Sequence, residues 1–174
     1  MKNYLLIEGV FDVKEVSQKH IEAVLELMNK SPFKELLELR FSGMGKGYAT
    51  AELDLQRKHL NPYGQIHGGI YYALLDVAAF WSIYCELEDN IGFTTLDLSV
   101  NNLASVSKLG SKISAEGKSI RIGRSICLAE AVVKDENGRL LAHATSKLML
   151  LGEKLSLDKA AEFLGFSKLP PKYI

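Results

Sequence analysis

The chain has 174 residues, of which 47% are hydrophobic and 24% charged, and these are the proportions of an ordinary globular protein with a sizeable core. Its 21 basic residues balance 21 acidic ones, so no net field favours nucleic acid or an anionic membrane as a partner. Cys85 and Cys127 lie in apolar stretches without metal-ligand spacing, which predicts reduced, buried thiols in a cytoplasmic protein. The amino terminus becomes charged too soon for a signal peptide.

The first third of the chain predicts two helices and a strand. A capping-box pattern at residues 12–15 and apolar residues at helical spacing up to Leu27 predict a first helix. Ser31 followed by Pro32 predicts the start of a second, short helix. The glycine-rich residues 43–47 predict a turn, and the alternation over residues 49–55 predicts a half-buried strand.

The middle of the chain contains a long apolar run with one charged residue, Asp76, between Lys58 and Glu86. The run predicts a helix that is apolar on every side and therefore buried. It approaches membrane-spanning length, but its central carboxylate and the lack of a basic flank argue against a span. A buried carboxylate without a partner costs several kcal/mol, so Asp76 needs a structural or a catalytic explanation.

The second half of the chain predicts only strands until the tail. Alternating patterns mark strands over residues 96–101, 113–117, 125–133 and 140–151, and Asn137-Gly138 predicts the hairpin between the last two. In the tail, Ser156 predicts a helix start and Gly165 its end. One long buried helix and about five antiparallel strands indicate an α+β fold whose sheet wraps the helix.

A polar motif precedes and follows the start of the long helix. It reads Asn61-x-x-Gly64-x-x-His67-Gly68-Gly69, with Asp76 seven residues later and Thr95 and Asn101 on the next strand. This constellation resembles the PaaI-like branch of the hotdog-fold thioesterases, over roughly residues 30 to 150. The resemblance implies a hotdog fold, in which an antiparallel sheet of five to six strands wraps one helix and the protein is dimeric. Residues 1–174 then form a single domain, with a helical extension at 1–30 and a tail at 153–174.

The resemblance also implies roles for residues of this motif. Asp76 is expected to act as general base or nucleophile, and the backbone N–H of Gly68 as oxyanion donor. Asn61 is expected to position the thioester or the water. Thr95 would orient the water, with Thr94 as the alternative because the preceding loop can shift the register by one residue.

Further site residues follow from the same resemblance and from the chemistry of CoA. His67 is expected in the catalytic loop, where it shapes the loop more than it acts as a base. Gly69 allows close approach of the substrate to the backbone. The phosphates of CoA call for basic residues, and the candidates at a strand turn are Lys118, Arg121 and Arg124. No metal and no cofactor are expected, since the CoA thioester is the substrate.

The spacing on the long helix has a consequence of its own. Gly68 and Asp76 are eight residues apart, which is about 12 Å along a helix axis, so the two cannot contact one thioester carbon. If both act, the helix start of one subunit must meet the aspartate of another, and a two-fold dimer supplies that arrangement twice. The sequence therefore favours a composite site between two copies.

The functional hypothesis is hydrolysis of an acyl-CoA thioester to free acid and CoA by a cytoplasmic homodimer or a homotetramer built from two dimers. Neither a nucleic acid nor a membrane is expected as a partner. The alternative is a non-catalytic acyl-CoA-binding sensor that uses the same pocket, and a purely structural role for Asp76 is the simplest competing interpretation. The acyl group, and the choice between attack by water and an acyl-aspartate intermediate, stay open at this stage.

Overall fold

The computed structural model describes residues 15–88 and 91–174. In chain order the elements are α1 (Gln18–Asn29), α2 (Pro32–Leu37), β1 (Arg40–Gly45), β2 (Tyr48–Asp54), η1 (Arg57–His59), α3 (Gly68–Ser82), η2 (Tyr84–Glu86), β3 (Gly92–Asn102), β4 (Lys112–Arg121), β5 (Ile126–Asp135), β6 (Leu140–Gly152), η3 (Glu153–Leu155) and α4 (Leu157–Leu164).

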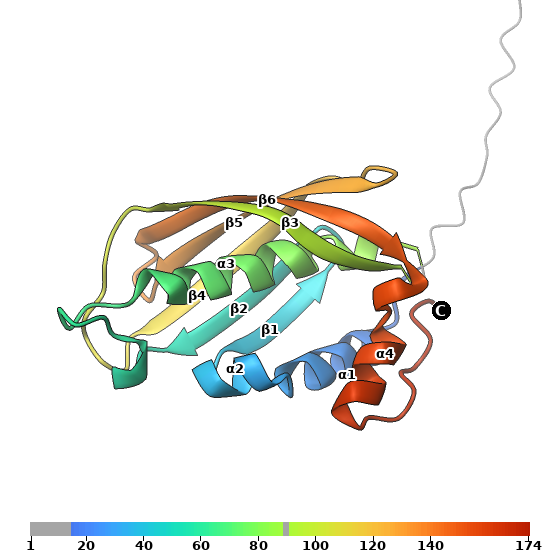
Figure 1. Ribbon diagram of the computed structural model, residues 1–174, viewed down its shortest axis with the longest axis horizontal. Coiled ribbons are helices and arrows are strands. Elements are labelled where there is room, and N and C mark those ends of the chain that lie inside the picture. Colours follow the sequence, from blue (N-terminus) through green and yellow to red (C-terminus); the bar gives the residue numbers. More distant parts are fainter. Residues whose placement is uncertain (1–14, 89–90) are drawn as a thin grey trace, which may run out of the picture.

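The six strands form one antiparallel sheet in the order β1-β2-β4-β5-β6-β3. Figure 1 shows the sheet curving around α3, with α1, α2 and α4 gathered at the β1 side. The α+β class and the sheet wrapped around one long helix are thereby confirmed, with six strands. β1 and β3 are the two edges of the sheet, so β3 has a partner strand only on its β6 side within this chain.

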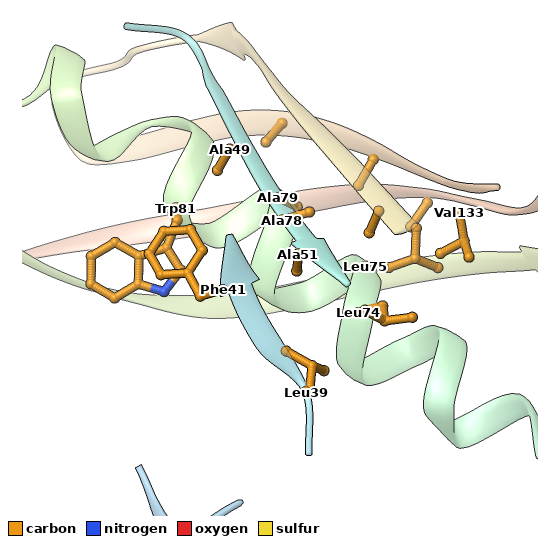
Figure 2. Packing of buried hydrophobic residues seen from close by; sticks show 14 of the residues in the cluster. Leu39, Phe41, Ala49, Ala51, Leu74, Leu75, Ala78, Ala79, Trp81 and Val133 are labelled. Carbon is orange, nitrogen blue, oxygen red and sulfur yellow. The ribbon is translucent and has the colours of Figure 1, made fainter. Parts of the chain in front are cut away.

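Small residues on the inner face of the sheet let α3 lie close to it. On β2 the inward positions are Ala49, Ala51 and Leu53, all buried, as the alternating sequence predicts. From α3, Leu74, Leu75, Ala78 and Ala79 fill the concave side. Figure 2 shows these helix residues beside the strand alanines, and the ring of Trp81 beside that of Phe41. Alternating alanine therefore sets the distance between helix and sheet.

Two predicted boundaries in the first third are wrong. The glycines expected to form a turn at 43–45 belong to β1, and the turn is confined to Lys46 and Gly47, where Gly47 has a φ of +79°. β1 was missed because its glycines obscure the alternation of buried and exposed residues. The first helix begins at Gln18 rather than near residue 12, and Val16 instead forms a bridge with Tyr173. Residues 12–14 lie outside the described part of the chain.

The other predicted elements are confirmed. Pro32 is the first residue of α2, and the Gly138 turn, with a φ of +79°, joins β5 to β6. α4 follows Ser156 and ends at Gly165, whose φ is +73°. Cys85 and Cys127 are both buried free thiols.

The expectation that α3 is buried on every side is wrong for one face. The face toward the sheet is buried, but the opposite face is open in the single chain because no described element covers it. On this open face Gly69 is exposed, Tyr72 is 45% exposed, and the half-buried residues are Ala73, Asp76, Val77 and Phe80. The segment Gly68–Glu86 is long and apolar enough to cross a membrane by composition alone. It is 61% buried inside the fold, and it is the core helix of the sheet.

The carboxyl-terminal residues are hydrogen-bonded to the segment that follows the carboxyl end of α3. The Lys172 side chain is 2% exposed and its Nζ donates hydrogen bonds to the backbone oxygens of Tyr84 and Leu87, at 2.9 and 2.7 Å. His20 of α1 bonds the backbone oxygen of Pro170 and the hydroxyl of Tyr84. Both terminal segments of the described chain therefore converge on the end of α3 that lies away from Gly68.

Candidate active site

The start of α3 presents an unused backbone donor. His67 is the N-cap, and its Nδ1 accepts a hydrogen bond of 2.9 Å from the N–H of Gly69. Within residues 15–88 and 91–174 the N–H of Gly68 has no hydrogen-bond partner. A free N–H at a helix start carries a partial positive charge, so Gly68 suits an oxyanion. His67 therefore acts as the cap of this helix start.

The side chain of Asn61 organises the loop that precedes α3. Its Oδ1 accepts hydrogen bonds from the N–H groups of Tyr63 and Gln65, at 2.9 and 3.2 Å. The carbonyl of His59 accepts from the N–H of His67 at 2.8 Å and ties the loop to the cap. The carbonyl oxygen of the Asn61 amide is thus engaged within its own loop, which leaves its NH2 group as the part that can face a ligand.

Asp76 and Thr95 form the polar pair of the site. Thr95 on β3 donates a hydrogen bond of 2.9 Å from its hydroxyl to Asp76 Oδ1 on α3. Burial raises the pKa of the Asp76 carboxyl above its ordinary value of 3.8, and the hydrogen bond from Thr95 lowers it in part. The structure therefore joins Thr95, and not Thr94, to Asp76. A carboxylate with a raised pKa is a stronger base than one in water.

A second contact joins the same two elements one helical turn farther on. Phe80 follows Asp76 by four residues on α3, and Phe93 precedes Thr95 by two on β3, so both pairs lie on matching faces. The rings of Phe80 and Phe93 stack with centroids 4.2 Å apart. The stacked rings of Phe80 and Phe93 therefore lie beside the Asp76–Thr95 pair on this side. The alternation along β3 was the signal that could have identified Phe93.

Gly68 and Asp76 lie on one continuous helix, as the spacing requires, and are about 12 Å apart along its axis. Beside Gly68 lies Asn102 at the end of β3: a β-carbon on Gly68 would be 3.0 Å from its Nδ2. The single chain thus contains two separate candidate half-sites, one around Gly68 and one around Asp76.

The predicted CoA-binding residues are exposed and do not join either half-site within the chain. Lys118 and Arg121 lie on β4, and Arg124 lies in the connection to β5. The strand order places β4 three strands away from β3, which carries Thr95. No group of three or more His, Cys, Asp or Glu side chains that could hold a metal occurs in the described part of the chain.

Known proteins share sequence and fold with this chain. The family model described as "Thioesterase superfamily" matches residues 63–142, which include the start of α3, Asp76 and Thr95. Over this segment, which is less than half of the chain, the sequence is similar to the thioesterase superfamily. The chain is 29% identical over 108 residues to a 1,4-dihydroxy-2-naphthoyl-CoA hydrolase of Listeria monocytogenes, with 62% of this chain and 86% of the relative covered.

Solved structures share the fold of this chain. A thioesterase from Haemophilus influenzae superposes with a TM-score of 0.69 at 22% identity, over 77% of this chain and 92% of the other. A mutant form of the phenylacetic acid degradation protein PaaI of Thermus thermophilus gives a TM-score of 0.63 at 24% identity, over 70% of this chain and 100% of the other. The resemblance to the hotdog-fold thioesterases is thereby confirmed.

Proposed function

We propose that the protein hydrolyses an acyl-CoA thioester to the free acid and CoA at a site shared between two copies of the chain. The observation that carries this proposal is the Asp76–Thr95 pair, a carboxylate of raised pKa held by one hydroxyl on the open face of α3. The relative that hydrolyses 1,4-dihydroxy-2-naphthoyl-CoA supports a CoA thioester as substrate.

The chemistry assigns one task to each half-site. At one, Asp76 removes a proton from a water molecule whose oxygen attacks the thioester carbon, or the carboxylate attacks directly and water releases the acyl group afterwards. At the other, the N–H of Gly68 stabilises the negative charge that develops on the carbonyl oxygen. The C–S bond then breaks, and the thiolate of CoA takes up a proton as it leaves.

Two features of the single chain support assembly as a homodimer. If Gly68 and Asp76 both act on one thioester, their separation of about 12 Å along α3 means that they come from different copies. The apolar open face of α3 and the free edge of β3 lie next to one another, and a two-fold axis beside them would cover both. Lys118, Arg121 and Arg124 are the proposed contacts for the CoA phosphates, and pairing of two such dimers gives the homotetramer.

The decisive experiment measures thiol release from short, long and aromatic acyl-CoAs by the wild type and by Asp76→Asn. We expect Asp76→Asn to lower turnover at least about a hundredfold, the scale of a lost general base. Asp54→Asn is the matched control, because Asp54 is an exposed carboxylate at the end of β2. Unchanged turnover in Asp76→Asn would contradict the assignment, and tight acyl-CoA binding without hydrolysis by the wild type would favour the sensor. The buried, free thiols Cys85 and Cys127 support a cytoplasmic location.

A further inference from the structure

An apolar cavity of about 400 Å³ lies at the end of α3 that is remote from Gly68. Its size is at the small end of the range of small-molecule sites, roughly 300–1,000 Å³. The cavity is lined mainly by apolar side chains from four parts of the chain: Met28 on α1, Phe80 and Trp81 on α3, Phe93 on β3, and Ala160 and Phe163 on α4. Nothing in the proposed hydrolytic chemistry uses this cavity.

The cavity lies next to the Asp76–Thr95 pair. Phe80 and Phe93 form both its wall and the aromatic contact one turn from Asp76 and Thr95. The distance from Asp76 to Phe80 is about 6 Å along the helix axis. A group bound at Asp76 through its carbonyl carbon therefore needs a flexible apolar extension of that length to enter the cavity. An acetyl group is too short to reach the aromatic contact, and a benzoyl group lacks the flexible chain that would pass it.

The tail of the chain supplies the outer wall. η3 and α4 contribute Leu155, Leu157 and Ala160, and these residues lie beyond residue 142, where the family match ends. Lys159 also lines the cavity, but its Nζ already donates a hydrogen bond of 3.0 Å to the backbone oxygen of Lys154. The cavity thus offers little to a charged or strongly polar group and matches a hydrocarbon chain.

We infer that this cavity holds the acyl chain of the substrate and that the substrate class is a medium-chain fatty acyl-CoA, with Ala160 as a specificity-determining residue. The inference rests on the proposed function for placing the thioester at Asp76. The chain of the acyl group passes Phe80 and Phe93 and ends against α4. The tail then sets chain length, while the chemistry remains on α3 and β3.

Trp81 gives a direct test, because it lines the cavity and is the single tryptophan of the chain. Decanoyl-CoA brominated near the chain terminus is added to Asp76→Asn, and the emission of Trp81 is recorded. We expect quenching by this probe and none by unbrominated decanoyl-CoA or CoA. Ala160→Phe, which fills the cavity, abolishes the quenching, whereas Glu162→Phe, on the exposed side of α4, retains it. Absence of quenching in Asp76→Asn overturns the inference.

Activity separates this inference from the proposed function. In Ala160→Phe we expect the ratio of kcat/KM for decanoyl-CoA over butyryl-CoA to fall about tenfold or more, the scale set by a mismatched apolar pocket. An equal loss for both substrates, or no loss, contradicts the acyl assignment while hydrolysis itself stands. Quenching by the brominated probe in a wild type that hydrolyses none of the thioesters would instead contradict the proposed function and leave the cavity assigned to the acyl chain.

Discussion

The backbone of Gly117 on β4 contacts the carbonyl of Ala78 on α3 so closely that a β-carbon at position 117 would overlap the carbonyl oxygen. Because the neighbour is helix backbone, the clash can be relieved only by moving α3 away from the sheet. We expect Gly117→Ala to lower the free energy of unfolding by about 1–3 kcal/mol or more, measured by urea denaturation. In Gly43→Ala the new β-carbon meets a Thr50 hydroxyl at 3.1 Å, which can rotate, so a much smaller loss is expected. Equal losses would argue against tight helix–sheet packing at Gly117.

Removing the hydroxyl of Thr95 tests its assignment to the site. Thr95→Val keeps the shape of the side chain but removes the hydrogen bond to Asp76, and bonds to charged groups contribute about 1.5–3 kcal/mol. We expect kcat/KM to fall by roughly tenfold to a hundredfold. The pKa seen in the acid limb of the kcat/KM profile should also rise, since the bond lowers the pKa of Asp76. A larger effect of Thr94→Val would reassign the role to Thr94.

The raised pKa of Asp76 predicts opposite effects of pH on activity and stability. Activity needs the carboxylate, so the acid limb of kcat/KM should lie above pH 3.8. Burial disfavours the charged form, so the folded state loses stability as pH rises from 3.8 through the raised pKa. Asp76→Asn carries no charge at this position and should have a higher Tm than the wild type at about pH 8, where the wild-type carboxylate is expected to be charged in its buried position. A Tm difference that is the same at about pH 3 and about pH 8 would exclude this linkage.

Subunit mixing tests whether the site is shared. Gly68→Pro removes the proposed oxyanion donor at a helix position that accepts proline, and Asp76→Asn removes the base. A heterodimer of the two variants contains one intact site if the residues come from different copies, so we expect about half of the wild-type activity in purified heterodimers. Gly68→Ala is the steric control, because it keeps the N–H and adds a β-carbon 3.0 Å from Asn102 Nδ2. Inactive heterodimers would place both residues of a site in one chain.

The sequence predicted the long helix and the strands after it because their hydrophobic periods are clear and their turns carry signals such as Asn137-Gly138. It left Thr94 and Thr95 open because the facing residue depends on the register of β3 against β6. That register shifts at Gly92/Phe93 and again at Thr95/Asp97, which no local pattern reveals.

Other features of the structure depend on contacts between distant segments. The open face of α3 was predicted to be buried because an apolar helix does not show which of its sides a single chain covers. The cavity could not be predicted at all, since Met28, Phe93 and Ala160 come together only when α1, β3 and α4 meet. Local sequence patterns therefore describe the elements better than the spaces between them.

The hydrogen bonds of Lys172 anchor the carboxyl-terminal tail to the core, so sequence changes in the tail can be considered apart from changes in the proposed site. The residues proposed to act on the thioester lie between Asn61 and Thr95, whereas the outer wall of the cavity lies in residues 155–163. Substitutions in α4 can therefore accumulate without disturbing Asp76 or Gly68. If α4 bounds the acyl chain as proposed, substitutions among its eight residues would change the acyl group that is accepted and leave the proposed hydrolytic chemistry unchanged.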